Sequence, residues 1–449
     1  MNKPPRTTRR TALRTMAAAG AGLLATPRFV FGRSENGSPP LPKSEDVEKV
    51  LWEKILPAWY PRCLDVDRGG FLENFAHDWS PKPTRSKCLV FQGRMTWVPA
   101  HIALHYERDR LQQRVYCLHG LEFLRRGMWD PKYGGFLDQV AGPGGPDPAV
   151  EPVKQMYSTA FGIYACAAVC QATNRPEALK LAQDAFAWIE QHAHDAEQGG
   201  YCEHLARDGK PLSLTPTDED FGQRFMVIGR VGHKSMNAHI HILEALSALR
   251  RVWDDPLLVK RLEEMFLIVR DKIVMPGGHL NMFADRNFTP VDEASSFGHE
   301  LEIAYLLAEA DELLHGHVSA ETARVARRLV DHSLQWGWDE EGGGFFYEGP
   351  PAGVPDKRAK SWWVLPEAMN GLLTVGRLFP DARTRYDQFF ARTWKFFHDK
   401  QLDHAHGGCY ANLGEDGLPD PPEQDKANRW KTAYHVVRGL VHASEAMRA

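Results

Sequence analysis

The stretch DVDRGGF at residues 65–71 sets a pattern that recurs along the chain: an acidic residue, a Gly-Gly pair and usually an aromatic residue. Close copies are DPKYGGF at 130–136, DAEQGGY at 195–201, DEEGGGF at 339–345 and DHAHGGC at 403–409, with a degenerate copy, MPGGHL, at 275–280. The second glycines are Gly70, Gly135, Gly200, Gly278, Gly344 and Gly408, so the steps are 65, 65, 78, 66 and 64 residues. Such regular spacing indicates six copies of one supersecondary unit.

The sequence between these turns has the periodicity of helices. Residues 178–190 (ALKLAQDAFAWIE) and 300–314 (ELEIAYLLAEADELL) place apolar side chains about every third or fourth position. A unit of about 65 residues holds two such helices and a Gly-Gly turn, whose positive φ costs glycine little. Strand-like pieces after the turns (GGFLEN, GGFLDQ, GGFFYE) predict small β-hairpins. Six helical hairpins predict an all-α fold, a closed (α/α)6 barrel rather than an open solenoid.

The first residues do not follow the repeat. Residues 8–14 (TRRTALR) precede a weakly hydrophobic run, MAAAGAGLLA at 16–25, which is too short to span a bilayer. An Arg-Arg pair before such a run resembles a twin-arginine export signal. We therefore predict a signal at 1–31, a Gly/Ser/Pro-rich linker at 32–44, the barrel at 45–449, and export to the periplasm or the medium.

The composition argues against a nucleic-acid-binding protein, a disulfide-rich protein and a protein with a thiolate zinc site. The 54 basic and 58 acidic residues give a net charge of −4, which argues against a nucleic-acid-binding surface and gives no reason to expect membrane association after export. The seven cysteines are odd in number and form no CxxC, so neither a disulfide framework nor a thiolate zinc site is indicated. HExxH and similar metal motifs are missing from the sequence. We expect neither a metal nor an organic cofactor.

Each repeat places a polar residue near the start of its first helix. Counted from the second glycine, these residues are Arg94 (+24), Tyr157 (+22), His241 (+41, or +28 without the 13 extra residues of that repeat), His299 (+21), Glu367 (+23) and His435 (+27). Equivalent offsets should bring them together at one end of the barrel. A lone histidine in an apolar helix is usually a core residue, but three at matched offsets, with an arginine and glutamates, favour proton chemistry.

A further histidine and a glutamate lie close in sequence to these six residues, and other histidines form pairs two residues apart. His299 and Glu302 are three apart and share a helix face, so the carboxylate can fix the imidazole tautomer. His239 and His241 are two apart and point in different directions. The pairs His192/His194, His315/His317 and His404/His406 have the same spacing in polar loops or at helix ends, and we expect them to be solvated.

Four motifs carry a family resemblance: NAHIHILEA at 237–245, GHELE at 298–302, KSWWVLPEA at 360–368 and RWKTAYH at 429–435. With them the chain resembles the N-acylglucosamine 2-epimerase superfamily, most closely its cellobiose 2-epimerase-like branch, from about Val47 to the C-terminus. The resemblance implies an (α/α)6 barrel in which His299 and His435 are the general acid/base pair. It also implies that His241 assists ring opening and proton handling.

The resemblance further implies a set of sugar contacts. Arg94 would bind near the reacting oxygens, Trp363 and Trp430 would hold sugar rings, and Glu302 and Glu367 would orient a histidine or sugar hydroxyls. The remaining expected substrate contacts are Tyr157, Asn237 and Tyr305. Tyr305 stands where members of this branch often carry tryptophan.

The residue chemistry is consistent with this function. Epimerisation at C2 of an open-chain aldose needs a group that removes a weakly acidic proton and one that returns a proton to the other face. Imidazole, with a pKa of about 6.5, can do both at neutral pH. We therefore predict a sugar 2-epimerase acting on glucose- and mannose-type reducing ends through a cis-enediolate. Its partner would be a small-molecule sugar, and the enzyme would be a monomer or homodimer.

Several alternatives remain open on the sequence alone. A single base returning its proton to C1 would give a ketose, as in a mannose isomerase-like aldose–ketose isomerase. An N-acylglucosamine 2-epimerase is a further possibility within the superfamily. The same barrel also serves glycoside hydrolases, for which Glu302 and Glu367 would be the two acids. A non-catalytic sugar-binding barrel would bind without exchanging hydrogen at C2.

Overall fold

A computed structural model describes residues 39–148, 151–212 and 230–448. The predicted signal and residues 32–38 of the predicted linker lie outside the described residues. In the part that is described, no helix is both long and apolar enough to cross a membrane. The seven cysteines are all within it and are free thiols.

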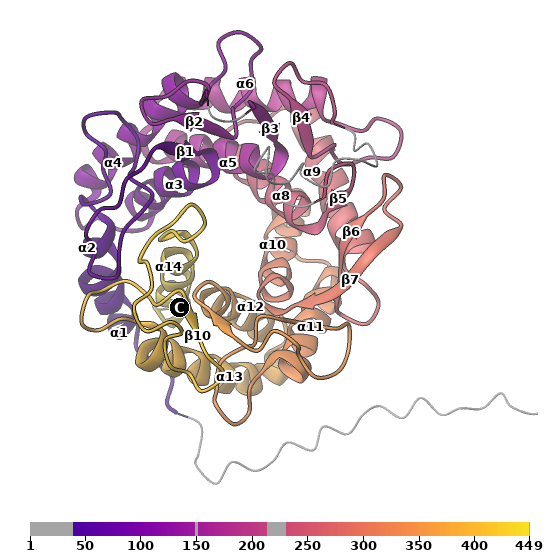
Figure 1. Ribbon diagram of the computed structural model, residues 1–449. Helices are drawn as coiled ribbons and strands as arrows, with labels where there is room; N and C mark the ends of the chain where they lie inside the picture. Colours follow the sequence, from indigo (N-terminus) through magenta and orange to yellow (C-terminus); the bar gives the residue numbers. More distant parts are fainter. Residues whose placement is uncertain (1–38, 149–150, 213–229, 449) are drawn as a thin grey trace, which may run out of the picture. The chain divides into compact units, whose positions relative to one another are not determined.

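Six inner helices form a closed ring (Figure 1). They are α3 (Leu89–His105), α5 (Met156–Thr173), α8 (Met236–Arg250), α10 (Phe297–His315), α12 (Val364–Leu378) and α14 (Tyr434–Arg448). Each packs against the next, and α14 packs against α3. This closure confirms the predicted (α/α)6 barrel.

An outer layer of helices covers the ring. It consists of α1 (Ser44–Val50) with α2 (Leu56–Trp59), α4 (Arg110–Phe123), α6 (Pro176–His192), α9 (Pro256–Ile268), α11 (Ala320–His332) and α13 (Arg383–Phe396). Short π-helical segments, Leu51–Ile55, Leu124–Met128, Val269–Ile273, Ser333–Gly337 and Phe397–Gln401, join α1 to α2 and extend α4, α9, α11 and α13. A 3-10 turn, Pro380–Ala382, precedes α13.

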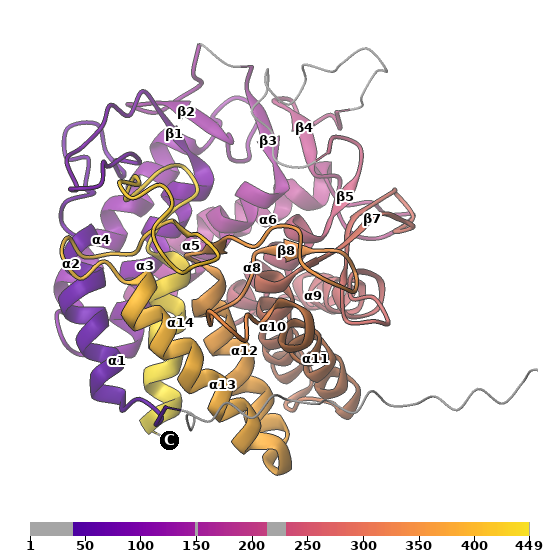
Figure 2. The same cartoon turned by 60° about the horizontal axis from the view of Figure 1, so that its bottom comes forward.

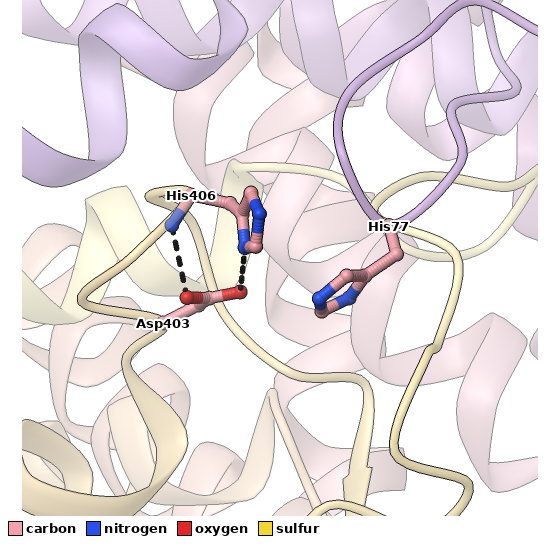
Figure 3. A group of neighbouring side chains, drawn as sticks. All are labelled: His77, Asp403 and His406. Atoms are coloured by element: carbon pink, nitrogen blue, oxygen red, sulfur yellow. Dashed lines mark hydrogen bonds and ion pairs between the residues drawn. The ribbon is translucent and has the colours of Figure 1, made fainter.

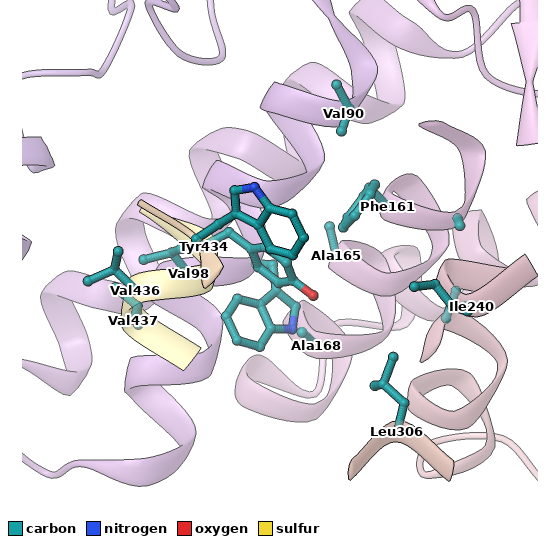
Figure 4. Packing of buried hydrophobic residues seen from close by; sticks show 14 of the residues in the cluster. Val90, Val98, Phe161, Ala165, Ala168, Ile240, Leu306, Tyr434, Val436 and Val437 are labelled. Atoms are coloured by element: carbon teal, nitrogen blue, oxygen red, sulfur yellow. The ribbon is translucent and has the colours of Figure 1, made fainter. Parts of the chain in front are cut away.

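The two layers differ in sequence because they differ in burial. Helix α5 (MYSTAFGIYACAAVCQAT) is apolar on nearly all sides, as expected of a helix enclosed by neighbours, whereas α11 (AETARVARRLVDH) has one apolar stripe. Figure 4 shows Phe161 of α5, Val98 of α3 and Tyr434 of α14 packed together inside the ring. At Gly93 of α3 a Cβ would lie 2.7 Å from the Phe161 carbonyl oxygen, so only glycine allows this approach.

The repeated turn has one geometry wherever its acidic residue is kept. In the first copy the Asp65 amide donates to Gly70 O (2.9 Å), and the Gly69 amide donates to Asp65 O (2.8 Å). The same two bonds form at Asp130, Asp195, Asp339 and Asp403. Gly70 has a φ of +66°, a left-handed conformation that favours glycine. The turns and strands gather at the end of the barrel where the inner helices begin (Figure 2).

The predicted small hairpins are present as antiparallel bridges across the repeated turns, such as Leu64 with Phe71 and Trp129 with Phe136, whereas the longer strands mostly pair between repeats, which was not predicted. The antiparallel pairs are β1 (Ser86–Cys88) with β2 (Gln139–Ala141), β3 (Val153–Gln155) with β4 (His204–Ala206), and β9 (Lys360–Ser361) with β10 (Asn412–Leu413). A four-stranded sheet joins β5 (Lys234–Ser235), β6 (Leu280–Ala284), β7 (Pro290–Ser296) and β8 (Glu348–Gly349), and only β6–β7 is a local hairpin. A single bridge, Phe75 to Ala427, closes the circle.

A buried ion pair accompanies each turn that keeps its aspartate. The pairs are Asp65–Lys87 (2.8 Å), Asp130–Lys154 (3.5 Å), Asp195–Lys234 (3.1 Å), Asp339–Lys360 (2.7 Å) and Asp403–Lys426. Each of the first three lysines stands two residues before an inner helix. In the degenerate repeat the corresponding residues are Met275 and Ser295, so both charges are missing together. Such paired loss is expected because an unpaired buried charge is costly.

Candidate active site

A pocket of about 200 Å³ opens at the end of the barrel where the inner helices begin. Its walls are Arg94, Tyr157, Asn237, His241, His299, Tyr347, Trp362, Trp363, Trp430 and His435. The residues predicted from matched repeat offsets therefore meet in one place, with one exception: Glu367 lies behind the wall. The pocket is walled by aromatic rings, and its arginine and three histidines come from four inner helices, α3, α8, α10 and α14.

His435, on the first turn of α14, is anchored by Glu367. Its Nδ1 lies 2.6 Å from Glu367 Oε1, so Nε2 is the nitrogen left for a substrate. Burial, together with the positive charges of Arg94 and Arg438, holds the pKa of His435 well below 6.5. At neutral pH this imidazole is uncharged and can accept a proton.

His299, on α10, is anchored differently from our expectation. Its Nδ1 lies 2.6 Å from Ser296 Oγ, and its ring centroid lies 4.6 Å from that of Trp363. Glu302 shares the helix face but bonds to Arg438 (2.5 Å) instead. Burial, then the neighbouring His241 and His435, holds the pKa of His299 well below 6.5.

His241 of α8 is held by a carboxylate one helical turn away. Its Nδ1 lies 2.9 Å from Glu244 Oε2. Burial opposes ionisation of Glu244, but Arg438 and His241 together lower the pKa of that carboxyl to about 2. His239 points elsewhere, as its spacing predicts: its Nδ1 contacts Ser235 O at 2.8 Å.

Beneath the pocket lies a buried charge cluster, which we define as Glu244, Glu302, Glu367 and Arg438. The Arg438 guanidinium, 2% exposed, contacts all three carboxylates. One positive charge does not balance three carboxylates, and burial together with the charge of Glu367 raises the pKa of Glu302 to about 7. Sequence analysis missed Arg438, although its place three residues after His435 puts it on the same helix face.

Part of the charge cluster, together with His435, has the spacing of a metal site, but Arg438 already contacts its carboxylates. Side-chain atoms of Glu302, Glu367 and His435 lie within 4.8 Å of one another, close enough to hold an ion. Arg438 Nη2 already lies 2.7 Å from Glu367 Oε1 and 2.5 Å from Glu302 Oε1. The guanidinium therefore supplies the positive charge that a metal ion would bring to these carboxylates.

Arg94 is held on three sides and 4% exposed. Its Nη2 donates to Tyr157 Oη (2.9 Å), its Nη1 donates to Trp430 O (3.3 Å), and its guanidinium lies 4.2 Å from the Phe161 ring centroid. Its Nε is buried without a partner among the described residues. A held guanidinium with a donor to spare suits a developing oxyanion.

Three predicted substrate contacts, Glu302, Tyr305 and Glu367, do not line the pocket. Tyr305 donates its hydroxyl to Glu367 Oε2 (2.8 Å) and lines a separate cavity of about 490 Å³ nearer the other ends of α10, α12 and α14. We therefore interpret all three as positioning residues. Two wall residues were missed, Tyr347 and Trp362, although Trp362 adjoins Trp363 in KSWWVLPEA and Tyr347 follows a repeated turn.

Comparison with known proteins places these features in a family. The sequence profile of the family described as N-acylglucosamine 2-epimerase matches residues 69–439. The cellobiose 2-epimerase of Bacteroides fragilis is 28% identical over 397 residues, covering 88% of this chain and 96% of the relative. That of Dictyoglomus turgidum is also 28% identical, over 408 residues, with the same coverage of both chains. The solved cellobiose 2-epimerase of Spirochaeta thermophila superposes with a TM-score of 0.79 at 29% identity, covering 90% of this chain and 96% of its own.

Proposed function

The chain belongs to the N-acylglucosamine 2-epimerase family, and we propose that it epimerises C2 of glucose- and mannose-type reducing-end sugars. As a member it is an isomerase. The observation that carries the proposal is the convergence of His241, His299 and His435, from three different inner helices, in one aromatic-walled pocket beside Arg94. The relatives named cellobiose 2-epimerase support a substrate with a second sugar ring beyond the reducing end.

The proposed chemistry follows from how each imidazole is anchored. His435 presents Nε2 because its Nδ1 is bonded to the Glu367 carboxylate, which also stabilises the imidazolium that forms when Nε2 takes the C2 proton. His299 also presents Nε2; once it has taken a proton from water, it returns one to the other face of the planar enediolate. In the reverse reaction the two roles exchange. Solvent hydrogen therefore enters C2 during turnover.

The other pocket residues have supporting roles in this proposal. Arg94 stabilises the enediolate oxygen through its guanidinium. His241, kept in place by Glu244, moves the proton needed to open the sugar ring. Trp363, whose ring centroid lies 4.6 Å from that of His299 and 5.5 Å from that of His435, packs against the sugar beside the reacting carbon.

The function is tested by incubating the protein with mannose, cellobiose or N-acetylglucosamine in heavy water and following C1 and C2 by NMR. We expect deuterium at C2 and an epimeric aldose from a non-acylated sugar. A ketose with deuterium at C1 would show an aldose–ketose isomerase, and turnover of N-acetylglucosamine alone would show an N-acyl-sugar epimerase. Cleavage of cellobiose, or binding without exchange, would refute the proposed chemistry.

A further inference from the structure

A second group of ionisable side chains lies where the last repeat meets the first. We define it as the seam cluster, His77, Asp403 and His406 (Figure 3). His77 follows the first turn, whereas Asp403 and His406 belong to the sixth turn, before α14. One ligand atom from each lies within 4.8 Å of the other two.

The distances approach those of a metal site. His406 Nδ1 lies 3.4 Å from Asp403 Oδ2, and the ring centroids of His77 and His406 are 4.7 Å apart. Ligand atoms around tetrahedral zinc, with bonds of about 2.0–2.2 Å, lie about 3.4 Å from one another. One of the three distances between ligand atoms already matches, and the other two, each within 4.8 Å, need to shorten by at most about 1.4 Å.

One ring nitrogen of His77 has no hydrogen-bond partner in the described part of the chain. His77 Nδ1 is buried and lacks a hydrogen-bond partner among the described residues. Figure 3 shows its ring turned toward Asp403 and His406. A buried nitrogen without a partner is uncommon in folded proteins and points to an unfilled ligand.

The other repeats show what is unusual here. Three turn carboxylates each bind two cations, a buried lysine and an arginine; the arginines are Arg68 on Asp65, Arg207 on Asp130 and Arg286 on Asp195. Among the described residues, Asp339 and Asp403 each have a lysine but no arginine, Lys360 and Lys426, and of these two only Asp403 also has an imidazole, that of His406, within 3.4 Å. On the side where an arginine contacts the first three carboxylates, Asp403 faces the imidazoles of His77 and His406. Because the carboxylates of Asp65, Asp130 and Asp195 each contact a lysine and a second cation, the Asp403 carboxylate can also accept a second positive charge beside Lys426.

We propose that His77, Asp403 and His406 bind one divalent transition-metal ion, of which Zn²⁺ is the best match. Imidazole nitrogens and a carboxylate are ligands that zinc favours, and His406, 40% exposed, leaves a path for the ion and a water ligand. The ion joins the two ends of the closed ring, where Trp79 Nε1 already donates to Gly407 O, 328 residues later. Closing so long a loop is where a cross-link stabilises most.

The test uses the full chain, stripped with a chelator and titrated with Zn²⁺ in equilibrium dialysis, with melting temperature as a second readout. We expect one ion per chain with a Kd on the order of micromolar and a rise in Tm of about 2–5 °C at saturation. His77→Gln and His406→Gln should each weaken binding at least about tenfold and remove the rise in Tm. Neither residue lines the proposed active site, so both variants should keep the wild-type activity.

The matched control is His404→Gln, two residues from His406 on the same turn, which should bind like the wild type. Co²⁺ provides a spectroscopic readout, because its tetrahedral visible absorption should form with the wild type and not with His77→Gln. Unchanged affinity in His77→Gln and His406→Gln, as expected if the ion binds near Glu302 and Glu367 instead, would overturn the proposal. So would equal loss in His404→Gln, or no binding at millimolar Zn²⁺.

Discussion

Replacing Glu367 with glutamine changes one charge and almost no volume. The buried carboxylate accepts hydrogen bonds from His435 (2.6 Å) and Arg438 (2.7 Å) on Oε1 and from Tyr305 (2.8 Å) on Oε2. Glutamine can occupy the same space but cannot balance an imidazolium on His435. With the charge-assisted bond removed, we expect kcat to fall by about 10²–10⁴-fold, equivalent to about 3–5 kcal/mol of transition-state stabilisation.

Stability should respond in the opposite sense. Burial and then the charge of Glu367 raise the pKa of Glu302 from 4.5 to about 7. Because the pKa of Glu302 is higher in the folded than in the unfolded protein, its contribution to the free energy of unfolding is complete below pH 4.5 and is lost as the pH rises through 7. By pH 8 the loss is about 3 kcal/mol. Glu367→Gln removes part of the repulsion, so about 1 kcal/mol of this loss should disappear.

The two effects are measured on the same variant, with kcat from NMR and urea unfolding at pH 5 and pH 8. Tyr305→Phe is the control, because it removes the bond to Oε2 and leaves the contact with His435, so kcat should fall less than about tenfold. If Glu367→Gln kept kcat within tenfold of the wild type, the carboxylate would not be needed to stabilise the imidazolium. If the variant were less stable than the wild type at pH 8, the expected relief of repulsion would be refuted, and Glu367 would be chiefly a counter-ion for Arg438.

Lys360→Ser should destabilise the protein to urea by about 3–5 kcal/mol, because Asp339 stays buried without its cation. The double variant with Asp339→Met should recover most of the loss, because it reproduces the uncharged pair of the degenerate repeat, Met275 and Ser295. Equal losses in the single and double variants would contradict this. Arg94→Lys should lower kcat/KM about 10²-fold in NMR turnover assays, since an ammonium cannot keep the planar contacts of the guanidinium, and a loss below threefold would contradict it. Removal of the C2 proton needs an uncharged imidazole and its return needs a protonated one. Because burial lowers the pKa of both His299 and His435, the protonated form becomes scarcer as pH rises, so kcat/KM should increase as the pH falls from 8 to 6; a decrease over this range would contradict the buried environment.

The barrel could be predicted from the sequence because its turns are local. Each Gly-Gly turn is closed by hydrogen bonds between residues close in sequence, such as Asp65 and Gly70, so the repeated motif can be recognised in the sequence. The pairing of strands between repeats is not local and was missed. So were the buried lysines: Lys87 follows its aspartate by 22 residues and Lys234 by 39, and this spacing hides the pattern.

The sequence predicted how far along the inner helices the site residues lie, but not the direction in which each side chain points. An offset from a glycine fixes how far along an inner helix a residue lies, and this was sufficient for Arg94 and His241. It does not fix which way the side chain points, since each residue turns the helix by about 100°. Glu367, although at a matched offset, therefore lies behind the pocket wall. Arg438 was missed because an arginine on a helix is usually solvated, and only the three surrounding glutamates make its burial favourable.

The central claim is that His299 and His435 carry the hydrogen at C2. The most direct measurement is the rate of deuterium incorporation at C2 in heavy water for the wild type, His299→Ala and His435→Ala, with folding of each variant checked by its melting temperature. We predict that the wild type forms the epimer with deuterium at C2 and that neither folded variant forms it, because a single histidine can exchange the proton only on its own face. Formation of the deuterated epimer by both variants at the wild-type rate would contradict this claim.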